Sequence, residues 1–130
     1  MGGYKYQLTE SYAVSTGIRI KKPISNVYIK MNTRGKLTIH AGYAWDGPSG
    51  PCPDFKSTMR GSLVHDALYQ FMRLGMLDRK HRNAADRLLY KHCRQDGLPR
   101  PLAWIVYKSV EKFAADYAKS KNRRKAITAP

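Results

Sequence analysis

Two short rows of alternating apolar and polar residues occupy the first third of the chain. The first row contains Val27, Ile29 and Met31, and the second contains Leu37, Ile39, Ala41 and Tyr43. A period of two is typical of β-strands, and Gly35 between the rows suits a turn that needs a positive φ angle. Weaker strand patterns at 4–8 and 17–20 extend this predicted hairpin into a small antiparallel sheet.

A loop rich in proline and glycine is predicted to follow the sheet at residues 45–56. The stretch WDGPSGPCPDF, residues 45–55, holds three prolines and two glycines. Proline lacks the backbone N–H that helices and central strands need, so this segment is expected to be a stiff loop of fixed shape.

After the loop, the apolar residues recur with the period of an α-helix. The first helix is expected to begin at a cap on Ser57 or Thr58 and to end before Gly75, a common helix stop. Its predicted apolar stripe comprises Leu63, Ala67, Leu68, Phe71 and Leu74.

Two further helices are predicted. The second begins at Asp78, a good N-cap, and ends near Gly97. Its inner side carries Ala85, Leu88, Leu89 and His92. The third follows Pro101, where the apolar residues again repeat at helical spacing. Its predicted stripe comprises Leu102, Ile105, Val106, Val110, Phe113 and Tyr117.

This order of elements predicts a single α+β domain over residues 1–118. Strands occupy 1–44, the rigid loop 45–56 and three helices 57–118, while the basic segment 119–130 is expected to be a flexible tail. Because only a short connection joins the first two helices, they should pack as an antiparallel hairpin.

The chain carries a large excess of positive charge, with a formal net charge of +15 at pH 7 over 130 residues. Such a charge favours partners rich in negative charge, namely nucleic acid, anionic lipid or an acidic protein. The bases of the tail are candidate anion or nucleic-acid contacts: Lys119, Lys121, Arg123, Arg124 and Lys125.

Composition argues against several other classes of protein. The apolar runs are too short for a transmembrane helix, so no membrane span is expected. Cys52 and Cys93 form no CxxC pair, which excludes a zinc ribbon and gives no disulfide framework. The N-terminus shows no export signal, so a location in the cytoplasm is expected.

A histidine and an aspartate are expected to meet between the first two helices. His65 precedes Gly75 by ten residues and Asp86 follows it by eleven, so at about 1.5 Å per residue both lie about 15 Å from the turn. A carboxylate that holds one imidazole nitrogen fixes the tautomer and leaves the other nitrogen free to take a proton. His65 and Asp86 are therefore the candidate catalytic pair, with Tyr69 and Tyr90 as candidate supports for Asp86. The same pair also suits a purely structural hydrogen bond between helices.

Three further residues suggest a metal site. Asp66 is turned about 100° from His65 and so can face the loop that carries Asp46 and Gly47. Carboxylate and carbonyl oxygens suit calcium, which would polarise a carbonyl group for attack. Asp46, Gly47 and Asp66 are thus candidate calcium ligands, although either carboxylate could instead cap a helix or bind loop amides.

Three motifs occur in order between Trp45 and Cys93: DGPSGP (46–51), HDALY (65–69) and ADRLLY (85–90). This order resembles DUF1353, an uncharacterised family of phage and bacterial proteins. Its pattern is a G-x-x-x-D-x-x-S-x-P loop followed by an HD helix and an A-D helix. The resemblance implies a phage or prophage origin, and hence a location in the host cytoplasm or the virion, but it implies no activity.

HDALY also resembles, more distantly, the His-Asp-x-x-Tyr helix of secreted phospholipase A2 enzymes, particularly the short bacterial and fungal type. That resemblance implies a hydrolase in which His65 is the base and Asp86 supports it. It also implies that Asp46 and Asp66 hold calcium.

Three functions therefore stay open. The first is a hydrolase of an ester or related carbonyl bond, with anionic lipid as one candidate substrate. The second is a non-enzymatic virion or tail protein whose charge binds DNA or an acidic neighbour. The third is a phage factor that binds and disables a host protein.

Overall fold

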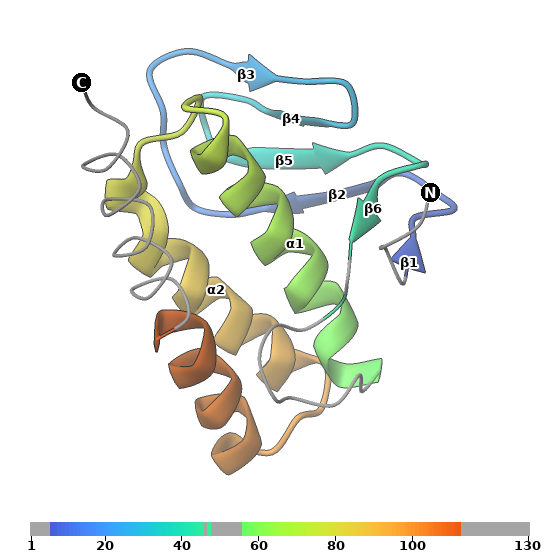
Figure 1. The fold of residues 1–130 in the computed structure, drawn as a ribbon, viewed down its shortest axis with the longest axis vertical. Coiled ribbons are helices and arrows are strands. Elements are labelled where there is room, and N and C mark those ends of the chain that lie inside the picture. Colours follow the sequence, from blue (N-terminus) through green and yellow to red (C-terminus); the bar gives the residue numbers. More distant parts are fainter. Residues whose placement is uncertain (1–5, 46, 48–55, 113–130) are drawn as a thin grey trace, which may run out of the picture.

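The computed structural model describes residues 6–45, 47 and 56–112 of the chain. Two antiparallel sheets come first and three helices follow, so the predicted α+β class is confirmed (Figure 1). None of the described helices is both long and apolar enough to span a membrane.

The larger sheet has four short strands in the order β2-β5-β4-β3. They are β2 (Tyr12–Ser15), β3 (Ile24–Ser25), β4 (Ile29–Met31) and β5 (Lys36–Ile39). The pairing of β4 with β5 confirms the predicted hairpin, and Gly35 between them has a φ of 90°. A side chain at that position would meet the carbonyl oxygen of Ile18 at 2.4 Å, so glycine is required on both counts.

A second, two-stranded sheet pairs β1 (Tyr6–Gln7) with β6 (Ala44–Trp45). This sheet ties the start of the described chain to the residues just before the proline-rich loop. In Figure 1 it lies beside the N-terminal half of α1, which is the helix that carries His65.

Three strand predictions were wrong. The row that begins at Leu37 does not continue to Tyr43 as one strand, because β5 ends at Ile39 and Ala41 is exposed in the turn that follows. Residues 17–20 form no strand, because Gly17 adopts a φ of 75° that ends the extended chain, and β2 forms earlier instead. Val27 does not share a buried face with Ile29. The Asn26 side chain accepts hydrogen bonds from the N–H groups of Tyr28 and Ile29, which makes a turn that leaves Val27 83% exposed at its tip.

The helices are α1 (Lys56–Arg73), α2 (Arg82–Gln95) and a third helix over residues 100–112. A 3-10 turn, η1 (Arg79–His81), precedes α2 and is capped by Asp78, whose side chain accepts from the Lys80 N–H at 2.8 Å. Asp78 was correctly predicted as a cap, but the α-helix itself begins four residues later.

The first helix differs from its prediction at both ends. It begins at Lys56, so the predicted caps Ser57 and Thr58 lie inside its first turn, and Thr58 is buried. Leu74, predicted in the apolar stripe, lies after the last helical residue and is exposed. Gly75, with a φ of 73°, reverses the chain so that Leu77 reaches the core instead.

The third helix also corrects a prediction, because Leu102 and Ile105 are exposed although both were placed in its apolar stripe. Ala103, Val106 and Val110 form the buried side. The predicted stripe residues Phe113 and Tyr117 lie outside the described residues.

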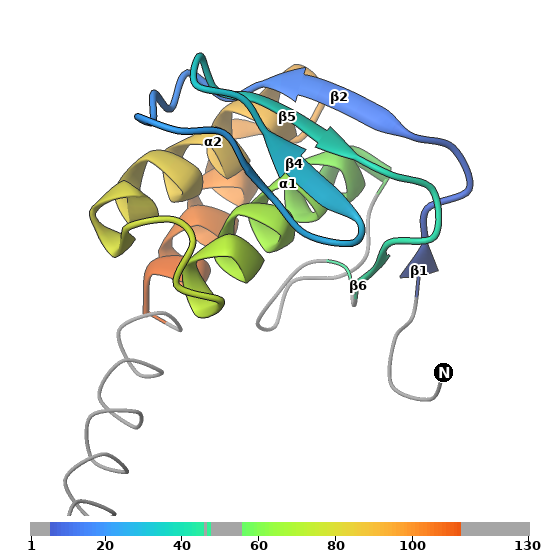
Figure 2. The same ribbon diagram turned by 90° about the horizontal axis from the view of Figure 1, so that it is seen from above.

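The described elements form layers, with the four-stranded sheet packed over one side of α1 (Figure 2). One hydrophobic cluster joins the sheet to α1 and part of α2, with Ile29, Leu37, Ile39, Leu68 and Phe71 at its centre. A second cluster joins α2 to the third helix and contains Leu89, Cys93, Leu98, Ala103, Val106 and Val110. Helix α1 therefore lies between the sheet and α2, so polar side chains between α1 and α2 are shielded from water.

Candidate active site between the first two helices

His65 on α1 and Asp86 on α2 meet between the two helices. The distance from His65 Nε2 to Asp86 Oδ1 is 2.7 Å, which is a hydrogen bond. Asp86 is fully buried and His65 nearly so. The geometric prediction that these side chains would lie level and in contact is confirmed.

Tyr69, one turn after His65 on α1, donates its hydroxyl hydrogen bond to the same oxygen, Asp86 Oδ1, at 2.7 Å. The ring centroids of His65 and Tyr69 are 4.2 Å apart. Burial, together with the nearby Asp86, raises the pKa of Tyr69 well above its ordinary value, so the phenol stays protonated and keeps donating. Tyr69 therefore supports Asp86 as predicted.

A glycine that sequence reasoning did not single out lies where α1 and α2 approach each other closely. A side chain at Gly61 would meet Leu89 Cδ1 at 2.9 Å and Cys93 Sγ at 3.3 Å. Gly61 therefore lets the helices pack closely one turn before His65. A glycine inside a helix costs stability, so its presence in an apolar helical pattern was a usable signal of such packing.

Tyr90 does not support Asp86, which corrects the prediction made from its position one turn further along α2. The second carboxylate oxygen, Asp86 Oδ2, is buried and has no hydrogen-bond partner among the described residues. Tyr90 instead packs edge-on against the rings of Trp104 and Tyr107, at 6.4 Å in each case. The third helix thus holds Tyr90 away from the carboxylate.

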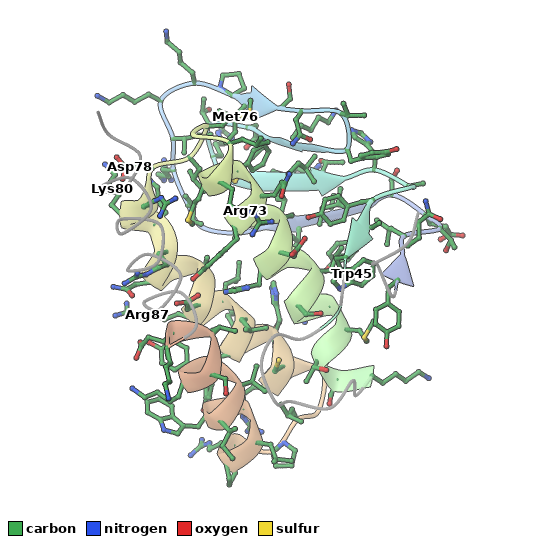
Figure 3. All side chains as sticks on the ribbon, viewed as in Figure 1. Trp45, Arg73, Met76, Asp78, Lys80 and Arg87 are labelled. Atoms are coloured by element: carbon green, nitrogen blue, oxygen red, sulfur yellow. The ribbon has the colours of Figure 1, made fainter. Side chains whose placement is uncertain are left out.

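Asp66 contacts the segment that precedes the proline-rich loop, whereas Asp46, which it was predicted to face, lies outside the described residues. The hydroxyl of Tyr43 donates a short hydrogen bond to Asp66 Oδ2. One turn earlier on α1, Ser62 Oγ accepts from Trp45 Nε1 at 3.2 Å. These two contacts fasten the end of the sheet along α1 next to His65, and Figure 3 shows Trp45 between β6 and α1.

The described residues do not by themselves form the predicted calcium site. They contain no group of three or more His, Cys, Asp or Glu side chains arranged to hold a metal ion. Asp66 contributes one carboxylate, and Gly47 is described with a φ of 84°, but Asp46 lies outside the described residues. Calcium binding stays a prediction. The tail bases Lys119 to Lys125 also lie outside the described residues.

His92 on α2 is a second buried histidine, correctly predicted on the inner side of its helix. Its Nδ1 atom is buried without a hydrogen-bond partner among the described residues. Burial, reinforced by the positive charge of Arg60, lowers the pKa of His92 to about 4. His92 is therefore neutral near pH 7.

Searches of family models, curated proteins and solved structures gave no match to this chain. The site itself is a buried carboxylate that joins an imidazole and a phenol across two helices.

Proposed function

We propose that this protein is a hydrolase of an ester or related carbonyl bond, with His65 as the general base. The observation that carries the proposal is the 2.7 Å contact between His65 Nε2 and Asp86 Oδ1 in a buried setting. With its Nε2–H donated to Asp86, the imidazole has its lone pair on Nδ1. That nitrogen would take a proton from a water molecule as the water attacks the carbonyl carbon. The imidazolium would then give the proton to the alkoxide that leaves when the ester C–O bond breaks.

Asp86 and Tyr69 act through His65 in this proposal. Asp86 fixes the tautomer and stabilises the imidazolium that forms during proton transfer. Tyr69 holds Asp86 Oδ1 in place by a second hydrogen bond to the same oxygen. The resemblance of HDALY to the phospholipase A2 helix supports an ester of a lipid as the substrate class, and the order of the three motifs supports a phage origin.

The test measures hydrolysis of chromogenic esters and of phospholipids, with calcium added and then chelated. His65→Gln should lower the rate by about 100-fold or more, the usual contribution of a general base. His92→Gln is the matched control, because it changes a buried histidine on the same helix pair that does not touch Asp86. A wild-type protein without hydrolytic activity, or a His65→Gln variant as active as the wild type, would overturn the proposal.

A second candidate is a non-enzymatic phage protein that binds nucleic acid or an acidic virion or host protein. The net charge of +15 favours it. In that case the His65–Asp86 contact only locks the helices together. Gel-shift assays at rising salt test this candidate, because binding through phosphates weakens steeply as counterions compete.

A further inference from the structure

The start of the third helix exposes three large apolar side chains within four positions. Leu102, Trp104 and Ile105, here called the apolar tip, are 42%, 54% and 53% exposed. The described part of the chain has seven large exposed apolar residues. The four that lie outside the tip form one pair at the turn after β3 and one pair at the turn after α1. Figure 1 shows the α1–α2 turn at the end of the molecule opposite the start of the third helix. A local concentration of this kind indicates a binding surface, whereas single exposed apolar residues do not.

Basic residues are frequent on α2 and on the third helix, which carries the apolar tip. Residues 87–112 contain six bases, namely Arg87, Lys91, Arg94, Arg100, Lys108 and Lys112. The only two acids in that range, Asp96 and Glu111, are each held in an ion pair, with Arg60 and Lys108. Arg87 points outward from α2 (Figure 3). The part of the chain that carries the tip therefore has an excess of positive charge, and Lys108 brings one of these charges to Trp104 itself.

Trp104 is held in a defined position at this surface. Its ring lies 5.4 Å from the ring of Tyr107 and 6.4 Å from that of Tyr90, and Lys108 Nζ lies 5.4 Å from its centroid. An indole that is fixed by neighbouring rings and half open to solvent loses little conformational entropy on binding.

We propose that the apolar tip binds the headgroup region of an anionic membrane. Tryptophan and tyrosine favour the boundary between headgroups and acyl chains, aliphatic side chains gain by insertion, and lysine and arginine attract anionic lipids. A nucleic acid would satisfy the bases and could stack on Trp104, but it would leave Leu102 and Ile105 in water. The apolar side chains therefore favour lipid. This surface requires no catalysis and does not rest on the proposed hydrolase.

The two tryptophans of the chain give a direct test. Trp104 is exposed, whereas Trp45 is buried and bonded to Ser62. The probe is vesicles of ether-linked phosphatidylglycerol and phosphatidylcholine, which contain no ester bond to hydrolyse. Fluorescence of the wild type should shift to the blue and become less sensitive to acrylamide on these vesicles, but not on phosphatidylcholine alone. Trp104→Phe, which leaves only the buried Trp45, should show no such change.

Cosedimentation with the vesicles gives a second readout. The double variant Leu102→Ser and Ile105→Ser should bind about tenfold more weakly or worse, because it removes two inserting side chains. Val27→Ser is the matched control, because it makes a similar polar change at the most exposed of these apolar residues on another element, and it should bind like the wild type.

Four results would overturn the proposal. They are equal binding to vesicles with and without phosphatidylglycerol, unchanged acrylamide quenching of Trp104 on bound protein, equal losses in the tip and Val27 variants, and no vesicle binding at all. The protein could instead bind no vesicles but bind a single-stranded oligonucleotide, with Trp104→Ala weakening that binding. In that case the surface binds nucleic acid. Because the lipids are ether-linked, none of these results depends on whether the protein is a hydrolase.

Discussion

Two histidines lie buried in the same pair of helices, and their surroundings differ. His65 Nε2 is hydrogen-bonded to Asp86, whereas His92 has a ring nitrogen with no partner among the described residues. His92 stays neutral because burial and the charge of Arg60 lower its pKa to about 4. The two histidines therefore differ in the carboxylate partner and not in burial. Under the proposed function, that partner would fix the tautomer of His65 and stabilise the ring when it takes a proton.

The largest effect on stability is expected from removing that carboxylate. Asp86→Ala leaves the buried His65 ring and the Tyr69 hydroxyl without their shared acceptor, so the free energy of unfolding should fall by about 3 kcal/mol. Urea unfolding followed by circular dichroism measures this. An unchanged midpoint would show that the polar contact contributes nothing to the helix pair.

The pH dependence of stability should come in part from His92. In the unfolded chain a histidine has a pKa of about 6.5, whereas the folded value for His92 is about 4. Between these values the unfolded state binds a proton that the folded state excludes. The contribution of His92 to stability is therefore fully present above about pH 6.5 and is lost as the pH falls towards about 4.

We expect this loss to be about 2 kcal/mol and to disappear in His92→Leu. Urea unfolding of the wild type and of His92→Leu between pH 7 and 4 gives the free energy of unfolding of each protein. In the difference between the two, the contributions of the other titrating groups cancel. The prediction would be contradicted if the stability of both proteins fell equally with pH, or if the His92 resonance titrated near pH 6.5 in the folded wild type.

A smaller effect is expected at Tyr69. Tyr69→Phe removes one of the two hydrogen bonds to Asp86 Oδ1 but keeps the ring beside His65, so the cost should be about 1 kcal/mol. If His65 is the base, the variant should also lose less activity than His65→Gln. A loss of stability equal to that of Asp86→Ala would mean that Tyr69, rather than His65, is the main partner of the carboxylate.

The smallest effect on stability is expected from a substitution of Arg60, whose charge acts on His92. Arg60 forms an ion pair with Asp96 at 2.9 Å, and both side chains are partly exposed, so Arg60→Gln should cost about 0.5 kcal/mol. Removing its charge should also raise the pKa of His92 part of the way from about 4 towards 6.5. Histidine titration by NMR measures this shift, and an unmoved resonance would leave burial as the whole cause.

The contact between His65 and Asp86 could be predicted because it depends on local rules. A short connection with Gly75 forces two neighbouring helices to be antiparallel, and a constant rise per residue then places the two side chains level. The same reasoning failed for Tyr90, since helical spacing brings it towards Asp86 but says nothing about a third helix that competes for its ring.

The contact of Asp66 with Tyr43 could be predicted only in outline, and the contact of Ser62 with Trp45 was not predicted. A rotation of about 100° from His65 put Asp66 on the side of the loop, but no local pattern indicates which side chain meets it. Likewise, Leu102 and Ile105 follow a helical period that predicts burial. They are exposed because Ala103, Val106 and Val110 occupy the side that packs on α2.

Local patterns in the sequence were enough to predict the α+β class, the sheet hairpin around Gly35, the antiparallel pair of helices and the contact of His65 with Asp86. These features follow from periodicity, turn chemistry and helix geometry, which act over a few residues at a time. The packing of distant elements set which face of the third helix is buried, which rings Tyr90 contacts, and which side chain binds Asp66. Those outcomes depend on how elements that are distant in sequence pack against one another, and a local pattern contains no information on that packing.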